Sequence, residues 1–241
     1  MEHSEAPDPT PLRPKRRIRG IIFDLDDTLV LSTVDFPKFK RQVIDRIESF
    51  GDERAQYDPS ETIVRIIDRF ETRMRDRGVA EAGIRRMLAE LDRIMDLVEL
   101  ERVDETAIIP GARETLRFLQ ERGVKVGVLT RGCAAYAARA VAKTGLDDLV
   151  DAMECRNSET RPKPYPDSYL RLTQALGVDK DETLFVGDHL IDAQCASNAG
   201  VPFIGVTTGD VPEREFLSGG SFMVVRDVGE LRDRLGPFLN D

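Results

Sequence analysis

The sequence has no tryptophan, only two histidines and only three cysteines among its 241 residues. Cys133, Cys155 and Cys195 are an odd set without Cys-x-x-Cys spacing, which argues against a disulfide framework or a zinc site and predicts reduced thiols in or near the core. No apolar run approaches the ~20 residues that span a bilayer. The N-terminus also lacks an apolar signal-peptide segment. We therefore expect a soluble, cytoplasmic protein with no membrane partner.

The sequence also has no excess of basic residues: it contains 35 Lys and Arg against 44 Asp and Glu, and its formal net charge is −9. This balance disfavours nucleic acid as a partner, since binding its phosphates requires a basic surface. A 41% share of hydrophobic residues is enough for the core of one large domain or two small ones. Residues 1–16 combine several prolines and charges with little apolar content, which predicts a disordered N-terminal extension.

What the sequence does have is a short apolar run, residues 21–23, that ends in Asp24 and Asp26. A run of this kind predicts a buried strand, and residues two apart on a strand share a face. Both carboxylates would therefore lie where the strand ends, which is where ligands bind in open α/β sheets. Crowded acids cost desolvation and repulsion unless a cation or a proton relieves them. One such pair alone is more typical of ordinary loop residues.

Two further segments place phosphate-binding groups after predicted strands or turns. The apolar run 124–129 ends in Thr130, where a hydroxyl and the backbone N–H groups that open a helix can hold a phosphate. Lys163 stands between Pro162 and Pro164, which stiffen the backbone around a fixed positive charge. Taken alone, each segment is also compatible with a strand end or a rigid surface linker.

A third segment adds carboxylates to the same set. The apolar run 183–186 ends in Gly187 and Asp188, and Asp192 would lie in the first turn of a helix that begins near Leu190. Four strand ends then present Asp, Thr, Lys and Asp side chains. This combination predicts a hard-oxygen site for Mg²⁺ beside a phosphate cradle.

In this order and spacing, the segments resemble the four motifs of the haloacid dehalogenase-like (HAD) hydrolase superfamily. The resemblance implies that Asp24 is the nucleophile and Asp26 the general acid/base. It also implies that Thr130, Arg131 and Lys163 hold the phosphoryl group. The implied Mg²⁺ ligands are Asp24, the backbone carbonyl of Asp26, and Asp188, with Asp192 ligating or supporting the metal. His189 departs from the pattern, because many relatives carry Ser or Thr there.

The resemblance indicates a Mg²⁺-dependent phosphatase for a small phosphorylated metabolite, with phosphoglycolate or a sugar phosphate as substrate. Family dehalogenases lack the second acid of the first motif, whereas this chain keeps Asp26. Two alternatives share the motifs: a phosphomutase of β-phosphoglucomutase type, and a non-catalytic module that binds phosphorylated ligands. Either a monomer or a homodimer is compatible with the sequence.

Residues 34–105 interrupt the alternation of strands and helices and predict three or four helices, over 36–50, 60–77 and 81–100. Residues 58–61 supply the start signal for the second of these. Arg65, Arg69, Arg73 and Arg77 recur every fourth residue; they could steer an anion, but nearby acids, including Glu61, make a charge-balanced solvated face the favoured interpretation.

A helical insert at this point resembles the cap of the phosphoglycolate phosphatase and β-phosphoglucomutase branch. We therefore expect a catalytic core over 17–33 and 106–241 with a helical cap over 34–105, and hinges near 31–35 and 106–111. After Gly111 the alternation predicts helices over 112–122, 134–144, 167–176, 192–199 and 228–235. Strands are predicted over 124–129, 150–153, 183–186, 203–206 and 222–225. This order indicates an α/β fold with a mostly parallel, three-layer Rossmann-like core.

Overall fold

The computed structural model describes residues 11–239, and its sheet is centred on the fully buried strand β1 (Gly20–Phe23). β1 pairs in parallel with β4 (Lys125–Leu129) on one side and β6 (Thr183–Gly187) on the other. The sheet order is β5-β4-β1-β6-β7-β8, and every pairing in it is parallel. The remaining strands are β7 (Phe203–Val206) and the two edge strands, β5 (Ala152–Glu154) and β8 (Met223–Val225). The carboxyl ends of all six strands therefore lie along one edge.

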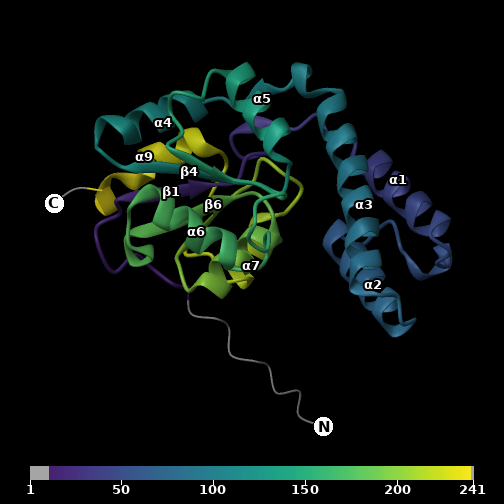
Figure 1. Ribbon diagram of the computed structural model, residues 1–241. Helices are drawn as coiled ribbons and strands as arrows, with labels where there is room; N and C mark the ends of the chain where they lie inside the picture. Colours follow the sequence, from purple (N-terminus) through teal and green to yellow (C-terminus); the bar gives the residue numbers. More distant parts are fainter. Residues whose placement is uncertain (1–10, 240–241) are drawn as a thin grey trace, which may run out of the picture. The chain divides into compact units, whose positions relative to one another are not determined.

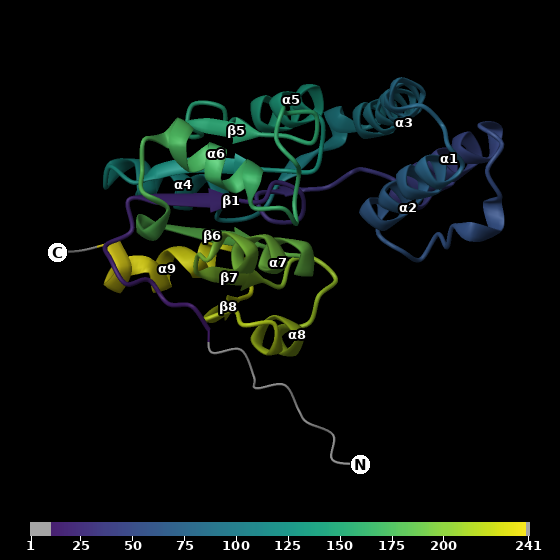
Figure 2. The ribbon, with the colours of Figure 1, turned by 60° about the horizontal axis from the view of Figure 1, so that its bottom comes forward.

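Helices cover both faces of this sheet, as Figures 1 and 2 show. α6 packs against β4 and β5 and α7 against β6 and β7, whereas α4 contacts β4 and α9, and α9 contacts β8. The helices are α4 (Ala112–Glu121), α5 (Ala134–Thr144), α6 (Asp167–Leu176), α7 (Leu190–Ala199), α8 (Glu213–Ser218) and α9 (Val228–Leu239). Tyr169, Phe185, Phe203 and Phe216 form a run of ring contacts on the α6–α7 side. The predicted three-layer architecture is confirmed.

The sequence did not predict several short elements around the sheet, among them a 3₁₀ turn over Lys180–Glu182. β2 (Val30–Leu31) and β3 (Ala107–Ile108) pair antiparallel in the segments that were expected to be hinges. α8 was also missed, and α9 continues past the expected residue 235 to Leu239. Elements this short are too brief to show a periodicity. The β2–β3 pairing joins the two segments of the chain that flank residues 33–105.

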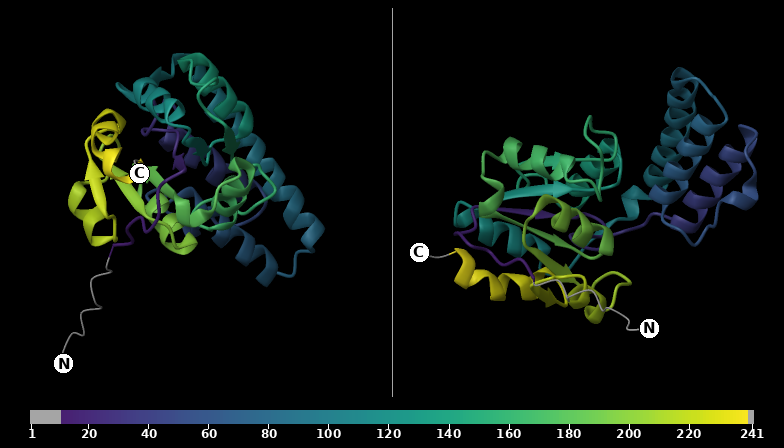
Figure 3. Two further views of the ribbon diagram at one scale, coloured as in Figure 1. Left: turned by 90° about the vertical axis from the view of Figure 1, so that its left-hand side faces the viewer. Right: turned by 90° about the horizontal axis from the view of Figure 1, so that it is seen from below.

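The chain divides into two compact units, a core unit and a helical unit that spans Thr33–Glu105. The helical unit contains α1 (Phe36–Ser49), α2 (Ile63–Asp76) and α3 (Glu81–Glu101), which pack on one another and appear in blue in Figure 3. Short 3₁₀ turns cover Arg54–Gln56 and Val103–Glu105. Apolar side chains at helical spacing fill its interior, including Val43, Ile66, Phe70 and Leu91. Helical periodicity therefore identified all three helices.

The start of α2 lies later than predicted. Asp58 does not cap the helix; its Oδ1 accepts the N–H of Ser60 at 2.8 Å and closes a turn ahead of it. The helix begins at Ile63, after Thr62 as its N-cap. Residues 58–61 therefore form a turn in the loop before α2 and are not the start of the helix.

The arginines of α2 are largely paired within the helical unit. Arg69 makes two 2.7 Å hydrogen bonds to Glu61, the partner that the sequence indicated. Arg73 makes two to Asp52, at 2.8 and 2.6 Å, and Arg77 lies 3.5 Å from the same carboxylate. The sequence did not single out Asp52, which lies on the turn after α1. These pairs favour the charge-balanced interpretation of the arginines.

Of the expected N-terminal extension, residues 1–10 lie outside the described residues, and residues 11–16 form no helix or strand. None of the helices within residues 11–239 combines the length and apolar character needed to cross a membrane.

Candidate active site

Lys163 joins two of the predicted acids at the carboxyl edge of the sheet. Its Nζ donates to Oδ1 of Asp24 and to Oδ1 of Asp192, both at 2.6 Å. Asp24 follows β1 directly, and Lys163 comes from the proline-rich loop before α6 and is only 2% exposed. Burial alone would lower the pKa of Lys163, but the charges of Asp192 and Asp24 outweigh it and raise the pKa above its ordinary value. Lys163 is therefore a fixed cation at this site.

Asp192 is held on both of its carboxylate oxygens. Oδ1 accepts from Lys163, and Oδ2 accepts the backbone N–H of His189 at 3.1 Å. His189 is the N-cap of α7, and its Nδ1 accepts the N–H of Ile191 at 3.1 Å, so the imidazole does the capping work of a Ser or Thr. A Cβ on Gly187 would lie 2.5 Å from Asp192 Oδ2, so only glycine allows this approach. Asp192 thus orients Lys163 and the start of α7.

Asp188 completes a group of three buried carboxylates. Thr28, which is fully buried, donates its hydroxyl to Asp188 Oδ1 at 3.2 Å. Asp24, Asp188 and Asp192 each offer a carboxylate oxygen within 4.8 Å of the others. Burial, followed by the negative charges of Asp24 and Asp192, raises the pKa of Asp188 above its ordinary range.

The same residues fit a magnesium ion. Three crowded, buried carboxylates face the single ammonium group of Lys163, which leaves an excess of negative charge that burial makes costly. Hard carboxylate oxygens are the donors that Mg²⁺ prefers. Asp24 and Asp188 fit as ligands, whereas both oxygens of Asp192 already have partners, which favours a supporting role for it.

Asp26 lies on the turn after β1, where the backbone is fixed by unusual geometry. Asp27 adopts a left-handed conformation with φ of 53°, and its Oδ1 accepts the N–H of Ser32 at 3.1 Å. Thr208 donates its hydroxyl to the carbonyl of Asp27. The hydroxyl of Tyr136, on α5, donates to Asp26 Oδ1.

The environment of Asp26 changes its acidity. Burial, and secondarily the charge of Asp24, raises the pKa of Asp26 to about 7, and the hydrogen bond from Tyr136 opposes this rise. Asp26 is therefore a carboxyl group that exchanges protons near neutral pH. Tyr136 was not identified from the sequence, although an aromatic residue six positions after Thr130 in an alanine-rich helix was visible there.

Thr130 directly follows β4, as predicted, and is 2% exposed. Its Oγ1 accepts the N–H of Gly132 at 2.9 Å, which leaves the hydroxyl hydrogen to donate elsewhere. Arg131 follows it, and its carbonyl accepts from Nε of the buried Arg156 at 3.2 Å. The sequence did not identify Arg156. That the guanidinium of Arg131 holds phosphate stays a prediction.

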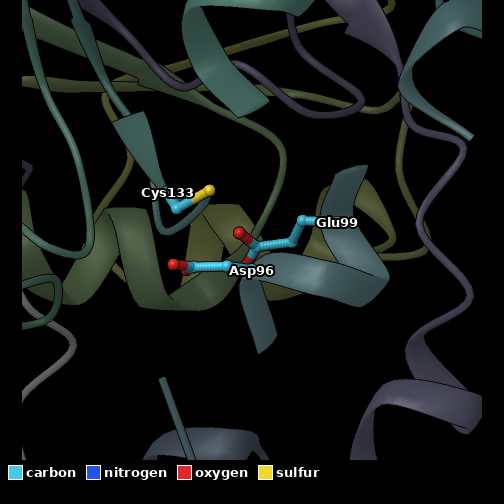
Figure 4. A group of neighbouring side chains, drawn as sticks. All are labelled: Asp96, Glu99 and Cys133. Carbon is cyan, nitrogen blue, oxygen red and sulfur yellow. The ribbon is translucent and has the colours of Figure 1, made fainter. Parts of the chain in front are cut away.

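The three cysteines form no disulfide and are buried, as expected. Cys133 is the N-cap of α5, where its Sγ accepts the N–H of Tyr136 at 3.4 Å. Figure 4 shows Cys133 together with Asp96 and Glu99, which come from α3. Because Cys133 belongs to the core unit and the two acids to the helical unit, we assign no metal site to this group.

Comparison with known proteins places the chain in a family. A sequence model of haloacid dehalogenase-like hydrolases matches residues 18–200. A phosphoglycolate phosphatase from Agrobacterium fabrum is 30% identical over 79% of this chain and 82% of its own. An N-acetylmuramic acid 6-phosphate phosphatase from Pseudomonas aeruginosa is 26% identical over 94% and 99%.

Solved structures show the same fold. The crystal structure of a hydrolase from Pseudomonas syringae superposes with a TM-score of 0.65 at 21% identity, covering 92% of this chain and all of the other. The residues at the carboxyl edge of the sheet, the parallel sheet itself and the sequence matches all indicate the same family. The chain belongs to the haloacid dehalogenase-like hydrolases, in the phosphoglycolate phosphatase-like branch, and is a phosphoric monoester hydrolase.

Proposed function

We propose that this protein is a Mg²⁺-dependent phosphatase that hydrolyses a small phosphorylated metabolite, phosphoglycolate or a sugar phosphate, through an aspartyl-phosphate on Asp24. The observation that carries the proposal is the Lys163 ammonium held 2.6 Å from Asp24 Oδ1 at the carboxyl edge of the sheet. In this proposal Asp24 is the nucleophile, and Lys163 is the cation that neutralises an incoming phosphate. The relatives that act on phosphoglycolate and on an amino-sugar 6-phosphate support both substrate classes.

The reaction follows from the roles of two carboxyl groups. The carboxylate of Asp24 attacks phosphorus, forming an acyl phosphate as the bond to the leaving alcohol oxygen breaks. Asp26 gives its proton to that oxygen, and the alcohol departs. Water then attacks the phosphorus, Asp26 takes a proton from it, and the bond to Asp24 breaks to release inorganic phosphate. A pKa of about 7 for Asp26 supports both directions of proton transfer.

The phosphoryl oxygens would be held by three groups at neighbouring strand ends. Lys163 supplies a buried positive charge, and the Thr130 hydroxyl has a hydrogen to donate. Arg131 adds a second cationic side chain next to Thr130. These groups position the phosphate for in-line attack, which is the main contribution of a protein to phosphoryl transfer.

The residues proposed to hold Mg²⁺ are Asp24, Asp188 and the backbone carbonyl of Asp26, with Asp192 in support. Bound Mg²⁺ supplies positive charge that lowers the repulsion between the phosphate and the carboxylates. Thr28 and Lys163 keep Asp188 and Asp192 in place for this.

The wider assignment rests on the same resemblance. We propose residues 17–33 and 106–241 as the catalytic core and residues 34–105 as a cap that selects the substrate. The protein would act in the cytoplasm as a monomer or homodimer, without nucleic acid or membrane partners.

The test is phosphate release from a panel of phosphoglycolate, N-acetylmuramic acid 6-phosphate, hexose phosphates, nucleoside monophosphates and an aryl phosphate. Each is assayed with Mg²⁺ and with a chelator, for the wild type, Asp24→Asn and Asp147→Asn. Asp147 is exposed on the turn between α5 and β5, so its variant controls for loss of one charge.

We expect Mg²⁺-dependent release that is abolished by Asp24→Asn and kept by Asp147→Asn. Release that survives in Asp24→Asn, or that needs no Mg²⁺, would contradict the mechanism. Turnover of a sugar phosphate only with a bisphosphate primer would indicate the phosphomutase. Binding of phosphorylated ligands without release would indicate the non-catalytic module.

A further inference from the structure

We propose that Tyr136 is a positioning residue for Asp26 and acts specifically on protonation of the leaving group; this inference rests on the proposed phosphatase function. Tyr136 is fully buried, and its hydroxyl donates to Asp26 Oδ1 across 110 residues of sequence. No role for this tyrosine follows from the four motifs, which end at Arg131 in this part of the chain.

The tyrosine ring is held where it is by its own turn. Cys133 caps α5 and its Sγ accepts the N–H of Tyr136 at 3.4 Å, which fixes the first turn of the helix. A Cβ on Gly132 would lie 2.6 Å from Cδ1 of the ring, so any other residue there would displace it. α5 in turn packs against β2 and β3.

Asp26, the acceptor, is equally constrained. The carbonyl of Leu25 accepts the N–H groups of Leu29 and Val30 at 2.9 and 3.0 Å, and Asp27 N donates to Val30 O at 2.7 Å. These bonds fix the backbone on both sides of Asp26, and the hydrogen bond from Tyr136 holds its side chain. A hydrogen bond between two groups that are both fixed selects one side-chain geometry at little further entropic cost.

The direction of the hydrogen bond determines which oxygen of Asp26 can carry a proton. A neutral tyrosine hydroxyl that donates to Oδ1 occupies that oxygen as an acceptor, so the acid proton resides on Oδ2. General acid catalysis requires the proton to face the leaving oxygen within hydrogen-bond reach. Tyr136 therefore keeps the proton-bearing oxygen available to the substrate.

This role predicts a dependence on the leaving group. An alcohol such as that of phosphoglycolate or a hexose leaves poorly without a proton, whereas a nitrophenolate leaves without one. Tyr136→Phe keeps the ring and removes only the hydroxyl. We expect it to lower kcat for alkyl phosphates about 10- to 100-fold, a part of the roughly 10²- to 10⁴-fold that general acid catalysis contributes, with little change in KM. For p-nitrophenyl phosphate we expect a change of less than about 3-fold.

Three further variants make the test specific. Asp26→Asn should lower kcat with both substrate types, because Asp26 is also the proposed base for the attacking water, and should lower it further with alkyl phosphates. Gly132→Ala should reproduce the Tyr136→Phe pattern by moving the ring. Tyr169→Phe is the matched control, because Tyr169 is equally buried and its hydroxyl is 2.8 Å from Thr183 Oγ1, away from the carboxylates. Thermal unfolding of each variant reports whether the core unit still folds.

The outcomes are distinguishable. Selective loss with alkyl phosphates in Tyr136→Phe, absent in Tyr169→Phe, would support the positioning role. Equal loss with both substrate types, or no loss, would overturn it while leaving the phosphatase intact. A wild type that releases no phosphate from any substrate would overturn the proposed function, and the role of Tyr136 with it.

Discussion

The core unit and the helical unit each bury aspartates, but the two units treat the negative charge in opposite ways. In the helical unit, the side chain of Asp52 is 1% exposed and accepts from Arg73 through two hydrogen bonds. Tyr57 adds a third donor to the same carboxylate. In the core unit, Asp188 lies beside Asp24 and Asp192, and Lys163 is the cation that bonds the latter two.

The acidities follow this difference. The hydrogen bonds from Arg73 outweigh burial and hold the pKa of Asp52 well below its usual range, whereas burial and like charges raise the pKa of Asp188. A buried carboxylate whose hydrogen bonds are satisfied contributes to stability. One that is left crowded and short of cations lowers stability, and this is the condition that binding of a metal ion and a phosphate can relieve. The comparison separates, within one chain, an acid that stabilises the fold from acids to which we assign a binding role.

The largest expected effect comes from removing Lys163, the cation that is bonded to two acids of the core unit. Lys163→Met leaves the carboxylates of Asp24 and Asp192 buried without their shared donor. Breaking a buried pair in this way costs about 3–5 kcal/mol of the free energy of unfolding. Phosphate release should also fall by roughly 10³-fold, because a fixed charge at the phosphate is lost. Urea denaturation followed by far-UV circular dichroism, together with the phosphate assay, measures both; a stable, active variant would contradict the assignment.

The second largest effect is expected at Asp52, the acid of the helical unit whose hydrogen bonds are satisfied. Asp52→Asn removes the charge that receives the bonds from Arg73, Arg77 and Tyr57, and we expect a loss of about 2 kcal/mol in the free energy of unfolding. Because the folded-state pKa of Asp52 is depressed, its contribution is fully present above its unfolded pKa of about 3.9 and declines as the pH falls below that value.

Denaturation of the wild type and of Asp52→Asn between neutral pH and about pH 3 tests both statements. The difference between the two proteins should be constant near neutral pH and should shrink in acid. A difference that grows as the pH falls would mean that Asp52 is not held as a charged, hydrogen-bonded group.

The crowded acid of the core should respond in the opposite direction. Asp188→Asn keeps the shape of the side chain and removes one of the adjacent negative charges. In the presence of a chelator, we expect the free energy of unfolding to rise by about 1 kcal/mol, while phosphate release with Mg²⁺ is lost. The comparison between Asp188→Asn and Asp52→Asn is internal, because both replace a buried aspartate by asparagine. Destabilisation of the chelated protein by Asp188→Asn would erase the distinction between the units.

The sequence predicted the parts of the molecule that depend on local patterns. Apolar runs gave the strands that carry Asp24, Thr130 and Asp188, and helical stripes gave α1 to α3. The structure places Asp24, Lys163, Asp188 and Asp192 together, whereas the chemical roles assigned to them stay predictions.

Hydrogen-bond partners that meet only through tertiary packing were not predicted from the sequence. Tyr136 reaches Asp26, and Thr208 reaches the carbonyl of Asp27, from elements far along the chain. Asp52 meets Arg73 because a turn after α1 packs against α2. No spacing rule connects such pairs, since the packing of whole elements brings them together.

The smallest expected effect belongs to an exposed ion pair at the other end of the same sheet. Lys125 Nζ lies 2.6 Å from Asp151 Oδ1, a distance equal to that between Lys163 and Asp24, but the Lys125 side chain is 50% exposed. Water solvates both charges when the pair is broken, so Lys125→Met should change the free energy of unfolding by about 0.5 kcal/mol or less and leave phosphate release unchanged. Denaturation alongside Lys163→Met compares two lysines with the same replacement and ion-pair distance. They differ in burial and in the number of carboxylate partners, which is two for Lys163 and one for Lys125. A loss as large as that of Lys163→Met would show that distance, and not burial, determines the effect, and the comparison between the units would fail.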